Sequence, residues 1–266
     1  MQNIIEAISY YSCGYCTNNQ VMMFKKEKKK ELVFPAGVYL IKHKKYGYVL
    51  YDTGYTTEIY RKKWLFKLYN YLNPTFIERN QMIDQQLKKT GIEPDEIKLI
   101  ILSHLHPDHI GGAKYFKNAR FLISQASYQV LQQKKLKDLI FKDFLPDDFL
   151  ERVDCITPDK NHESFPYKNS YDFFGDGSLL LSSFDGHASG QLCLYLPEER
   201  LFIAADICWG IELLPLTSKI RCIPALIQKD MNAYLASIEC LRQIITDGNQ
   251  VVVSHDPEKR VQEVLK

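Results

Sequence analysis

Short apolar runs, separated by polar stretches, recur along the whole chain. Most are four to seven residues long and rich in Val, Ile, Leu and Tyr, a pattern typical of buried strands. The predicted strands fall at residues 38–41, 48–51, 98–102, 120–123, 178–184, 191–196, 201–205 and 250–253. Two neighbouring pairs predict hairpins, with their turns at residues 44–47 and 197–200.

Helical spacing appears between the strand groups. Apolar residues from Met231 to Ile245 recur every three or four positions, and Asp230 precedes them as a candidate N-cap. Residues 80–89 and 124–133 also predict helices. Strand groups in two halves with helices between them indicate an α/β fold, in which two sheets pack together and helices cover the outside.

Two segments outside this framework are unusually aromatic. One spans residues 60–76 and contains Trp64, and the other spans 139–149 and contains Phe141. Such segments suit a satellite core, an oligomer interface or the wall of an apolar substrate pocket. We expect one domain over residues 1–266, with aromatic helical insertions around 57–90 and 125–150.

The amino-acid composition and the net charge limit the kinds of binding partner that we expect. The 266 residues are 45% hydrophobic and 25% charged, as in ordinary globular proteins, and the net charge is +2. This balance gives no reason to expect nucleic acid or a membrane surface as a partner. Residues 1–7 lack the basic start of a secretory signal, and no apolar run is long enough to span a bilayer. We therefore expect a cytoplasmic protein.

The seven cysteines are scattered, which favours a reducing compartment over a disulfide framework. Cys13 and Cys16 form a lone C-x-x-C motif, followed by polar residues and without further ligands nearby. A turn after the first strand is favoured over a redox or structural-metal role. The basic run at residues 25–30 predicts a solvated hairpin tip.

Residues 104–109 contain the highest concentration of candidate metal ligands in the chain. They read His-Leu-His-Pro-Asp-His, after an apolar strand and before Gly111 and Gly112. Neutral imidazoles and a carboxylate are the ligands that zinc and its neighbours prefer. Three histidines and an aspartate so close together are hard to explain by packing, so the run predicts a metal site.

This run resembles the H-x-H-x-D-H signature of the metallo-β-lactamase superfamily. Four further segments match that family in the same order along the chain. They are Asp52-Thr53-Gly54, Gly186-His187, Asp206 at the end of an apolar strand, and His255 at the end of the last strand. The resemblance covers residues 36–256 and implies an αβ/βα sandwich with metals in a cleft along one edge.

The resemblance also implies two divalent metal ions per chain and assigns their ligands. His104, His106 and His187 would hold one ion, Asp108, His109 and His255 the second, and Asp206 would bridge both. Zinc is the default, although iron, manganese or cobalt also suits nitrogen and oxygen ligands.

The other candidate residues are expected either to support the metal ligands or to lie away from the metal site. Asp52 is expected behind the ligands, where it orients a ligand histidine, and a plain turn residue is the alternative. His43 and His162 match no motif position and are expected on the surface or in loops.

Such a centre would use a hydroxide shared by the two ions to attack a carbonyl carbon, with Asp108 as the catalytic residue that orients it. The overall pattern is most similar to the N-acyl-homoserine lactonase-like subgroup. We therefore expect hydrolysis of a lactone or other carboxylic ester of a hydrophobic small molecule. Thioester hydrolysis is the alternative reaction, and a metal-retaining binding protein with little turnover is the alternative class.

Two departures from the lactonase pattern concern the substrate. Gln191 stands where the subgroup usually has a second histidine, and Trp209 stands where many members have a tyrosine, three residues after the bridging aspartate. We expect Trp209, Trp64 and Phe141 to line the substrate pocket. A homodimer formed through the aromatic segments is a further expectation.

Overall fold

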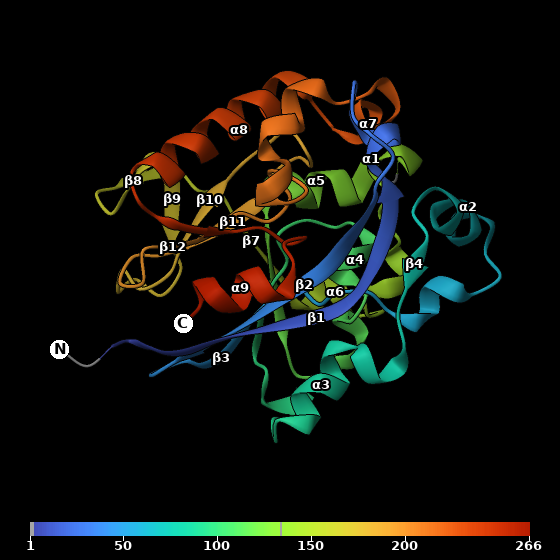
Figure 1. Ribbon diagram of the computed structural model, residues 1–266. Coiled ribbons are helices and arrows are strands. Elements are labelled where there is room, and N and C mark those ends of the chain that lie inside the picture. Colours follow the sequence, from blue (N-terminus) through green and yellow to red (C-terminus); the bar gives the residue numbers. More distant parts are fainter. Residues whose placement is uncertain (1–2, 134) are drawn as a thin grey trace.

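The computed structural model describes residues 3–133 and 135–266, which form two mixed β-sheets packed face to face with helices outside (Figure 1). The predicted αβ/βα sandwich is therefore confirmed. No helix among the described residues is long and apolar enough to cross a bilayer.

The first sheet has seven strands in the order β4-β1-β2-β3-β5-β6-β7. Its strands β1 to β3 pair antiparallel, and β3, β5, β6 and β7 pair parallel. The bounds are β1 (Ile5–Asn19), β2 (Glu31–His43), β3 (Gly47–Tyr51), β4 (Thr75–Phe76), β5 (Leu99–Ile101), β6 (Arg120–Ser124) and β7 (Val153–Ile156).

The second sheet has six strands in the order β13-β12-β11-β10-β9-β8. All its neighbours pair antiparallel except β12 and β13, which are parallel. The bounds are β8 (Lys160–His162), β9 (Phe165–Asp172), β10 (Leu180–Ser183), β11 (Leu192–Leu196), β12 (Leu201–Ile203) and β13 (Gln250–Val252).

Helices cover the outer faces of the two sheets (Figure 1). The α-helices in the described residues are α1 (Gln20–Met23), α2 (Trp64–Leu72), α3 (Ile83–Lys89), α4 (Pro107–Ile110), α5 (Gln125–Gln133), α6 (Phe149–Arg152), α7 (Cys222–Ile227), α8 (Met231–Thr246) and α9 (Glu258–Val264). The 3₁₀ turns are η1 (Thr57–Tyr60), η2 (Arg79–Gln81), η3 (Pro94–Glu96), η4 (Ala113–Tyr115), η5 (Leu136–Asp138), η6 (Lys142–Phe144) and η7 (Ile211–Lys219).

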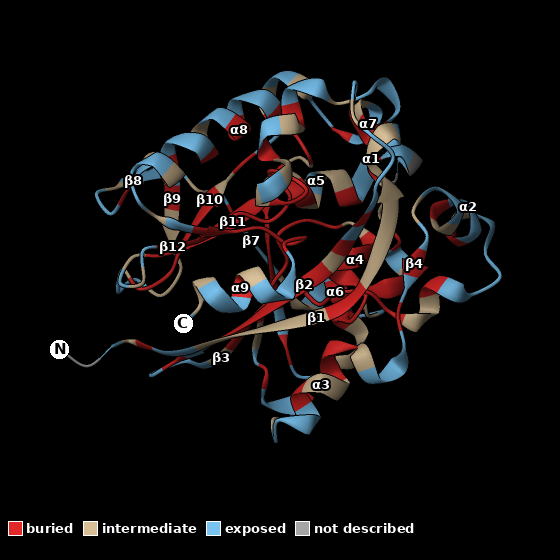
Figure 2. Ribbon diagram, viewed as in Figure 1, coloured by how far each residue is buried: buried red, intermediate tan, exposed pale blue. Residues whose placement is uncertain are grey.

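The inner strands of the first sheet, β2, β3, β5 and β6, are buried on both faces along most of their length, and their side chains alternate between the two faces. On β2, Tyr39 and Ile41 face the second sheet, whereas Val38 and Leu40 belong to the core under the outer helices. Figure 2 shows both sheets as the buried centre of the molecule, with exposed residues concentrated on the helices. This double burial explains why these strands read as continuous apolar runs.

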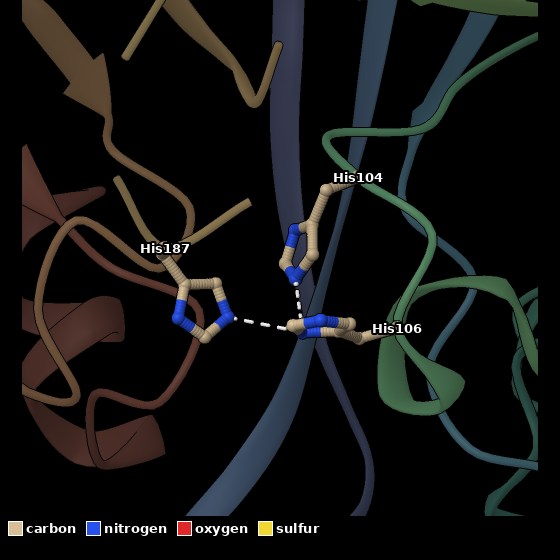
Figure 3. Close-up of side chains that lie close together, drawn as sticks. All are labelled: His104, His106 and His187. Atoms are coloured by element: carbon tan, nitrogen blue, oxygen red, sulfur yellow. Dashed lines mark hydrogen bonds between the residues drawn. The ribbon is translucent and has the colours of Figure 1, made fainter. Parts of the chain in front are cut away.

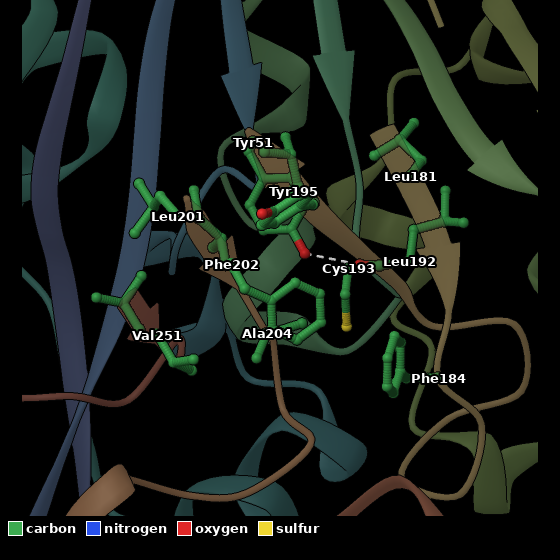
Figure 4. Packing of buried hydrophobic residues seen from close by; sticks show 14 of the residues in the cluster. Tyr51, Leu181, Phe184, Leu192, Cys193, Tyr195, Leu201, Phe202, Ala204 and Val251 are labelled. Carbon is green, nitrogen blue, oxygen red and sulfur yellow. Dashed lines mark hydrogen bonds between the residues drawn. The ribbon is translucent and has the colours of Figure 1, made fainter. Parts of the chain in front are cut away.

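The core between the sheets combines aromatic and aliphatic side chains from both (Figure 4). Tyr51 of β3 reaches across it, and its hydroxyl donates a hydrogen bond of 2.6 Å to the carbonyl oxygen of Leu192. A buried phenol needs such a partner, and this one fixes the first sheet against β11 of the second.

All eight predicted strands and both hairpin turns are confirmed, as are the helices at 124–133 and from Met231. Asp230 caps α8, since its side chain accepts hydrogen bonds from the backbone N–H groups of Asn232 and Ala233. The helix predicted at 80–89 is divided between η2 and α3. The basic run at 25–30 lies in the connection between the antiparallel strands β1 and β2.

Two sequence interpretations were wrong. Cys13 and Cys16 lie within β1 rather than in a turn, at a point where the register with β2 shifts between Ser12 and Tyr15. His43 is buried, not a surface residue, because its ring packs against the rings of Tyr46 and Phe174 and its Nε2 atom lies 3.2 Å from polar atoms of Asp176 and Ser178. All seven cysteines carry free thiols.

Candidate metal centre

The run at residues 104–109 follows the end of β5, in the centre of the first sheet. His104 and His106 precede the single-turn helix α4, and His106 is its N-cap residue. Pro107 occupies the first helical position, where its missing N–H costs nothing. This short turn directs the imidazole rings of His104 and His106 toward the same point.

Three imidazoles converge on that point (Figure 3). Nε2 of His104 lies 2.9 Å from Nδ1 of His106, and Nε2 of His187 lies 3.0 Å from the same atom. His187 comes from the loop after β10, so the second sheet completes the set. Ring nitrogens at such mutual distances suit a single ion with zinc–nitrogen bonds of about 2.0–2.1 Å.

A second group lies beside the first. One donor atom each from Asp108, His109, Asp206 and His255 lies within 4.8 Å of the others. Asp206 follows β12 and His255 follows β13. The Nε2 atom of His255 lies 3.0 Å from Oδ2 of Asp206, and that oxygen also lies 3.5 Å from Nε2 of His187 in the first group.

Two buried polar atoms show that this second group fits a cation. Nε2 of His109 and Oδ1 of Asp206 have no hydrogen-bond partner among the described residues, and they lie 3.5 Å apart. Buried polar atoms are rarely left unpaired, and an ion between a nitrogen and a carboxylate oxygen satisfies both. The seven predicted ligands are thus brought together as two adjoining sets.

Groups behind the ligands hold the imidazoles in place. Nδ1–H of His109 donates to Asp52 at 2.8 Å, and the same carboxylate accepts the N–H and the hydroxyl of Ser103. Nδ1 of His255 lies 2.7 Å from the carbonyl oxygen of Pro35, and Nδ1 of His187 lies 3.1 Å from Oε1 of Gln228. In each case one ring nitrogen is tied back and the other is left for an ion.

Burial and charge divide the histidines into two kinds. Burial and the neighbouring imidazoles hold the pKa values of His104 and His106 well below the ordinary value. Burial also acts on His255, but the carboxylates of Asp206 and Asp108 outweigh it and raise its pKa to about 9. The pKa of Asp206 is well below its usual range because His255 and His109 overcome its burial. The first set is therefore neutral, and the second is an ion-paired cluster.

A cavity of about 90 Å³ opens directly onto the first set of histidines. Its lining combines polar and apolar side chains, among them His106, Asp138, Ile140, Gln228 and Lys229. A larger cavity of about 610 Å³ lies beside it and shares Val130 and Ile140 as walls.

The three predicted pocket residues lie in different places. Trp64 and Phe141 line the larger cavity, although Trp64 is 64% exposed. Trp209 is buried in a separate cluster with Phe24 and Phe34 and is not among the residues that line either cavity. His162 ends β8 and is half-buried.

Sequence reasoning missed Gln228, Ser103 and Asp138. Ser103 directly precedes the metal-binding run, and its place there was the available signal. Gln228 and Asp138 lie in segments without a motif, and only the tertiary fold brings them to the site.

Together, the sandwich and the two adjoining ligand sets define an α/β protein with the residues for a metal centre between its two sheets. The family model described as the metallo-beta-lactamase superfamily matches residues 33–244, and the chain belongs to that family. Family membership confirms the resemblance stated from the motifs.

Individual relatives agree with this family. N-acyl homoserine lactonase AttM of Rhizobium johnstonii is 27% identical over 84% of this chain and 82% of its own length. AiiA of Bacillus thuringiensis subsp. kurstaki, also an N-acyl homoserine lactonase, is 27% identical over 64% of this chain and 62% of its own length. The predicted enzyme class, a metallo-hydrolase, agrees with these relatives.

Solved structures show the same fold. A variant of Bacillus thuringiensis AiiA with N-decanoyl-L-homoserine at its active site superposes with a TM-score of 0.73, at 18% identity, over 97% of this chain and 96% of that chain. AidC, described as a dizinc quorum-quenching lactonase, superposes with a TM-score of 0.69 at 17% identity, over 94% of this chain and 87% of that chain.

Proposed function

We propose that this protein is a dinuclear metal-dependent hydrolase that opens a lactone, or a related carboxylic ester, of a hydrophobic small molecule. The observation that carries the proposal is the junction of two ligand sets at Asp206, beside a cavity that opens onto the histidines. The curated relatives are N-acyl homoserine lactonases, so an N-acyl homoserine lactone is the first substrate to test.

Each set of residues would hold one ion. Zinc suits both, because the first set offers three imidazole nitrogens and the second combines imidazole nitrogens with carboxylate oxygens. One ion would be held by His104, His106 and His187, the other by Asp108, His109 and His255, with Asp206 shared between them. When bound, the ions supply a Lewis acid for the substrate carbonyl and lower the pKa of water.

Asp108 and the larger cavity are the protein's own contributions to the proposed reaction. The Asp108 carboxylate is buried, and Oδ2 lies 3.6 Å from Nε2 of both His109 and His255. In this position it would orient the attacking water, take its proton and pass it to the leaving oxygen. The larger cavity, with apolar walls from Phe66, Leu131 and Phe141, would shelter the acyl chain.

The test combines metal analysis with a substrate panel on zinc-loaded protein. We expect two ions per chain and turnover of an N-acyl homoserine lactone. Asp108→Asn should lower kcat by about 10²- to 10⁴-fold, the range for a lost general base. Asp154→Asn is the matched control, because Asp154 is an exposed aspartate paired with Arg120.

Other outcomes of the same panel would overturn the proposal. Fewer than one ion per chain after loading would contradict the dinuclear centre. Two tightly bound ions without turnover of any lactone, ester or thioester would identify a metal-retaining binding protein.

A thioesterase is the second candidate, and one observation favours it. Four lysines, at positions 62, 63, 135 and 142, line the larger apolar cavity together with one carboxylate, Asp143, which pairs with Lys63. Cations around an apolar cavity suit an acyl group on a phosphate-bearing thiol carrier. Faster turnover of an acyl thioester than of the lactone with the same chain would select this candidate.

A further inference from the structure

Helix α7 presents an apolar face to solvent. Ile223, Leu226 and Ile227 are exposed, the first two at 70% and 83%. Their spacing of three and four residues places the three side chains on one face of the helix. Met22 of the neighbouring helix α1 is also exposed (Figure 1). Single apolar residues on a surface are ordinary, but a group of them marks an interaction site.

The tip of the hairpin formed by β1 and β2 is anchored beside α7. The backbone N–H of Lys25 donates to the carbonyl oxygen of Lys219. An isolated antiparallel bridge between Phe24 and Ile220 follows it. The hairpin tip therefore forms one surface with α7, the α7 face, which comprises residues 22–31 and 219–227.

The α7 face is strongly basic. Five exposed lysines lie in the hairpin tip, at positions 25, 26, 28, 29 and 30. Lys219 and Arg221 add two cations, whereas the carboxylates of these two segments are Glu27, which pairs with Lys219 at 3.0 Å, and Glu31. Because the whole chain has a net charge of +2, the remainder of the chain is net acidic. The overall composition therefore conceals a local basic cluster.

Exposed apolar side chains beside a cluster of lysines match the surface of an anionic bilayer. Apolar side chains enter the boundary between headgroups and acyl chains, while lysines attract the phosphates. A second copy of this chain fits less well, since a two-fold contact brings two lysine clusters together. Nucleic acid engages the lysines but leaves the apolar helix face exposed to water.

We infer that the α7 face binds the surface of an anionic lipid bilayer. The apolar side chains of α7 lie at the boundary between headgroups and acyl chains, and the lysines of the hairpin tip lie against the phosphates. The contact is peripheral, since no helix among residues 3–133 and 135–266 is long and apolar enough to cross a bilayer.

The α7 face also borders the cavity at the metal centre. Leu226 and Ile227 line the cavity that opens onto the first set of histidines. Docking therefore places this cavity next to the bilayer, where hydrophobic molecules are concentrated. The inference goes beyond the proposed function and does not depend on it, because docking requires neither a metal ion nor turnover.

The test is cosedimentation of the zinc-loaded protein with lipid vesicles. We expect binding to vesicles of phosphatidylcholine mixed with phosphatidylglycerol, and binding at least about 10-fold weaker to pure phosphatidylcholine. High salt should release the protein, because it screens the lysines from the phosphates. Absence of binding to the anionic vesicles, or equal binding to both kinds, would overturn the inference.

Charge variants test the hairpin tip. The double variant Lys28→Gln/Lys29→Gln should weaken binding about 10- to 30-fold, since each lysine near an anionic surface contributes about fivefold. Lys88→Gln/Lys89→Gln is the matched control, because it removes the same charge from α3 at the other end of the molecule (Figure 1). Equal losses in the two double variants would contradict docking through the α7 face.

Apolar variants test α7 itself. The double variant Ile223→Ser/Leu226→Ser keeps every charge and should weaken vesicle binding by about 10-fold or more. Leu150→Ser, which changes an exposed leucine of α6, is the control and should have little effect. Unchanged binding of the α7 variant would exclude insertion of the helix. A dimer in analytical ultracentrifugation that this variant dissociates, without any vesicle binding, would assign the face to a second copy of the chain instead.

Discussion

Asp52 supports the candidate centre although it contributes no atom to either ligand set. It has a positive φ of 62° at the end of β3, a conformation that non-glycine residues seldom adopt. From there one carboxylate binds the N–H and hydroxyl of Ser103 and the Nδ1–H of His109. Burial raises its pKa, although His109 and Ser103 favour the charged form. The residue thus determines which nitrogen of His109 is presented to an ion.

Replacing this carboxylate should therefore weaken metal binding. Asp52→Asn offers a poorer acceptor to His109, and we expect a loss of about 10- to 100-fold in affinity for zinc, the range for groups behind a ligand histidine. Competition with a chromophoric chelator measures it. Asp154→Asn should leave the affinity unchanged, and an unaltered affinity in Asp52→Asn would contradict the role.

The cysteines near the N-terminus should be chemically inert in the folded protein. Burial raises the pKa of the Cys13 thiol well above its ordinary value and raises that of Cys16 to about 12. Only a thiolate attacks a disulfide reagent, so both groups remain protonated and unreactive from pH 7 to pH 9.

Labelling with a disulfide reagent checks this expectation. The exposed thiols of Cys155 and Cys222 should react first, and Cys13 and Cys16 only after unfolding in denaturant. Rapid labelling of Cys16 at pH 7, or a Cys13–Cys16 disulfide under mild oxidation, would instead support a redox role for the motif.

The loop between β10 and β11 depends on close contact with α8. Gly186 has a φ of 124°, and a Cβ atom there would lie 2.2 Å from backbone atoms of Tyr234 in α8. Only a residue without a side chain lets the helix approach this closely, and the approach determines the position of His187. The glycine in the G-H motif is therefore a packing requirement of the helix.

Gly186→Ala should be strongly destabilising. Positive-φ strain and the collision with α8 together predict a loss of about 2–5 kcal/mol in the free energy of unfolding. Gly175→Ala is the matched control, because Gly175 also has a positive φ, of 73°, but open space around it. The control should lose about 1–2 kcal/mol. Urea denaturation measures both, and equal losses would exclude the collision.

The aromatic segments divide into a packed face and an exposed face. Phe66 of α2 packs against Phe141 and Phe144, with ring centroids 4.9 and 5.1 Å away. On the same helix, Trp64 and Tyr71 are exposed. The inner face is therefore part of the core under the outer helices, and Phe66 and Phe141 also line the larger cavity. The outer face is the candidate for a dimer contact.

Alanine substitutions separate these two faces. Phe144→Ala should cost about 3–5 kcal/mol in the free energy of unfolding, as for a fully buried phenylalanine. Trp64→Ala should cost less than about 0.5 kcal/mol in the monomer. Analytical ultracentrifugation of the wild type and of Trp64→Ala then tests the predicted homodimer. The prediction requires that the wild type sediments as a dimer and that Trp64→Ala dissociates more readily into monomers.

The ligands could be predicted from the sequence because they occur in short segments, each at the end of a strongly apolar strand. The strands that sequence patterns missed have the opposite character. β1 is half-buried along much of its length, and β8 has two exposed residues out of three, so neither forms an apolar run. Gln228 and Asp138 are recognisable only from tertiary contacts, which no local pattern encodes.

At the scale of the whole molecule, the centre joins the two sheets. His104, His106 and His109 come from the first sheet, and His187, Asp206 and His255 from the second. An ion bound between them cross-links the halves of the sandwich and stabilises the folded state.

Metal removal should therefore lower thermal stability as well as activity. Each ion present at 100 times its Kd adds about 2.7 kcal/mol to the free energy of unfolding, so dialysis against a chelator should lower the Tm by several degrees. Addition of zinc should restore the Tm. An unchanged Tm on complete removal, confirmed by elemental analysis, would contradict ligation across the sheets.

The last strand has a consequence for how the protein is made. His255 follows β13, its ring is held by the carbonyl oxygen of Pro35, and the backbone N–H of Gly37 donates to Ser254. The second ligand set thus depends on segments that lie more than 200 residues apart in the sequence, since His255 contacts Pro35 with a sequence separation of 220. During synthesis, a ribosome exposes the 104–109 run long before residue 255, so the nascent chain presents open histidines without their final partners. We therefore expect the complete second ligand set to become available to a metal ion only after residue 255 has been synthesised.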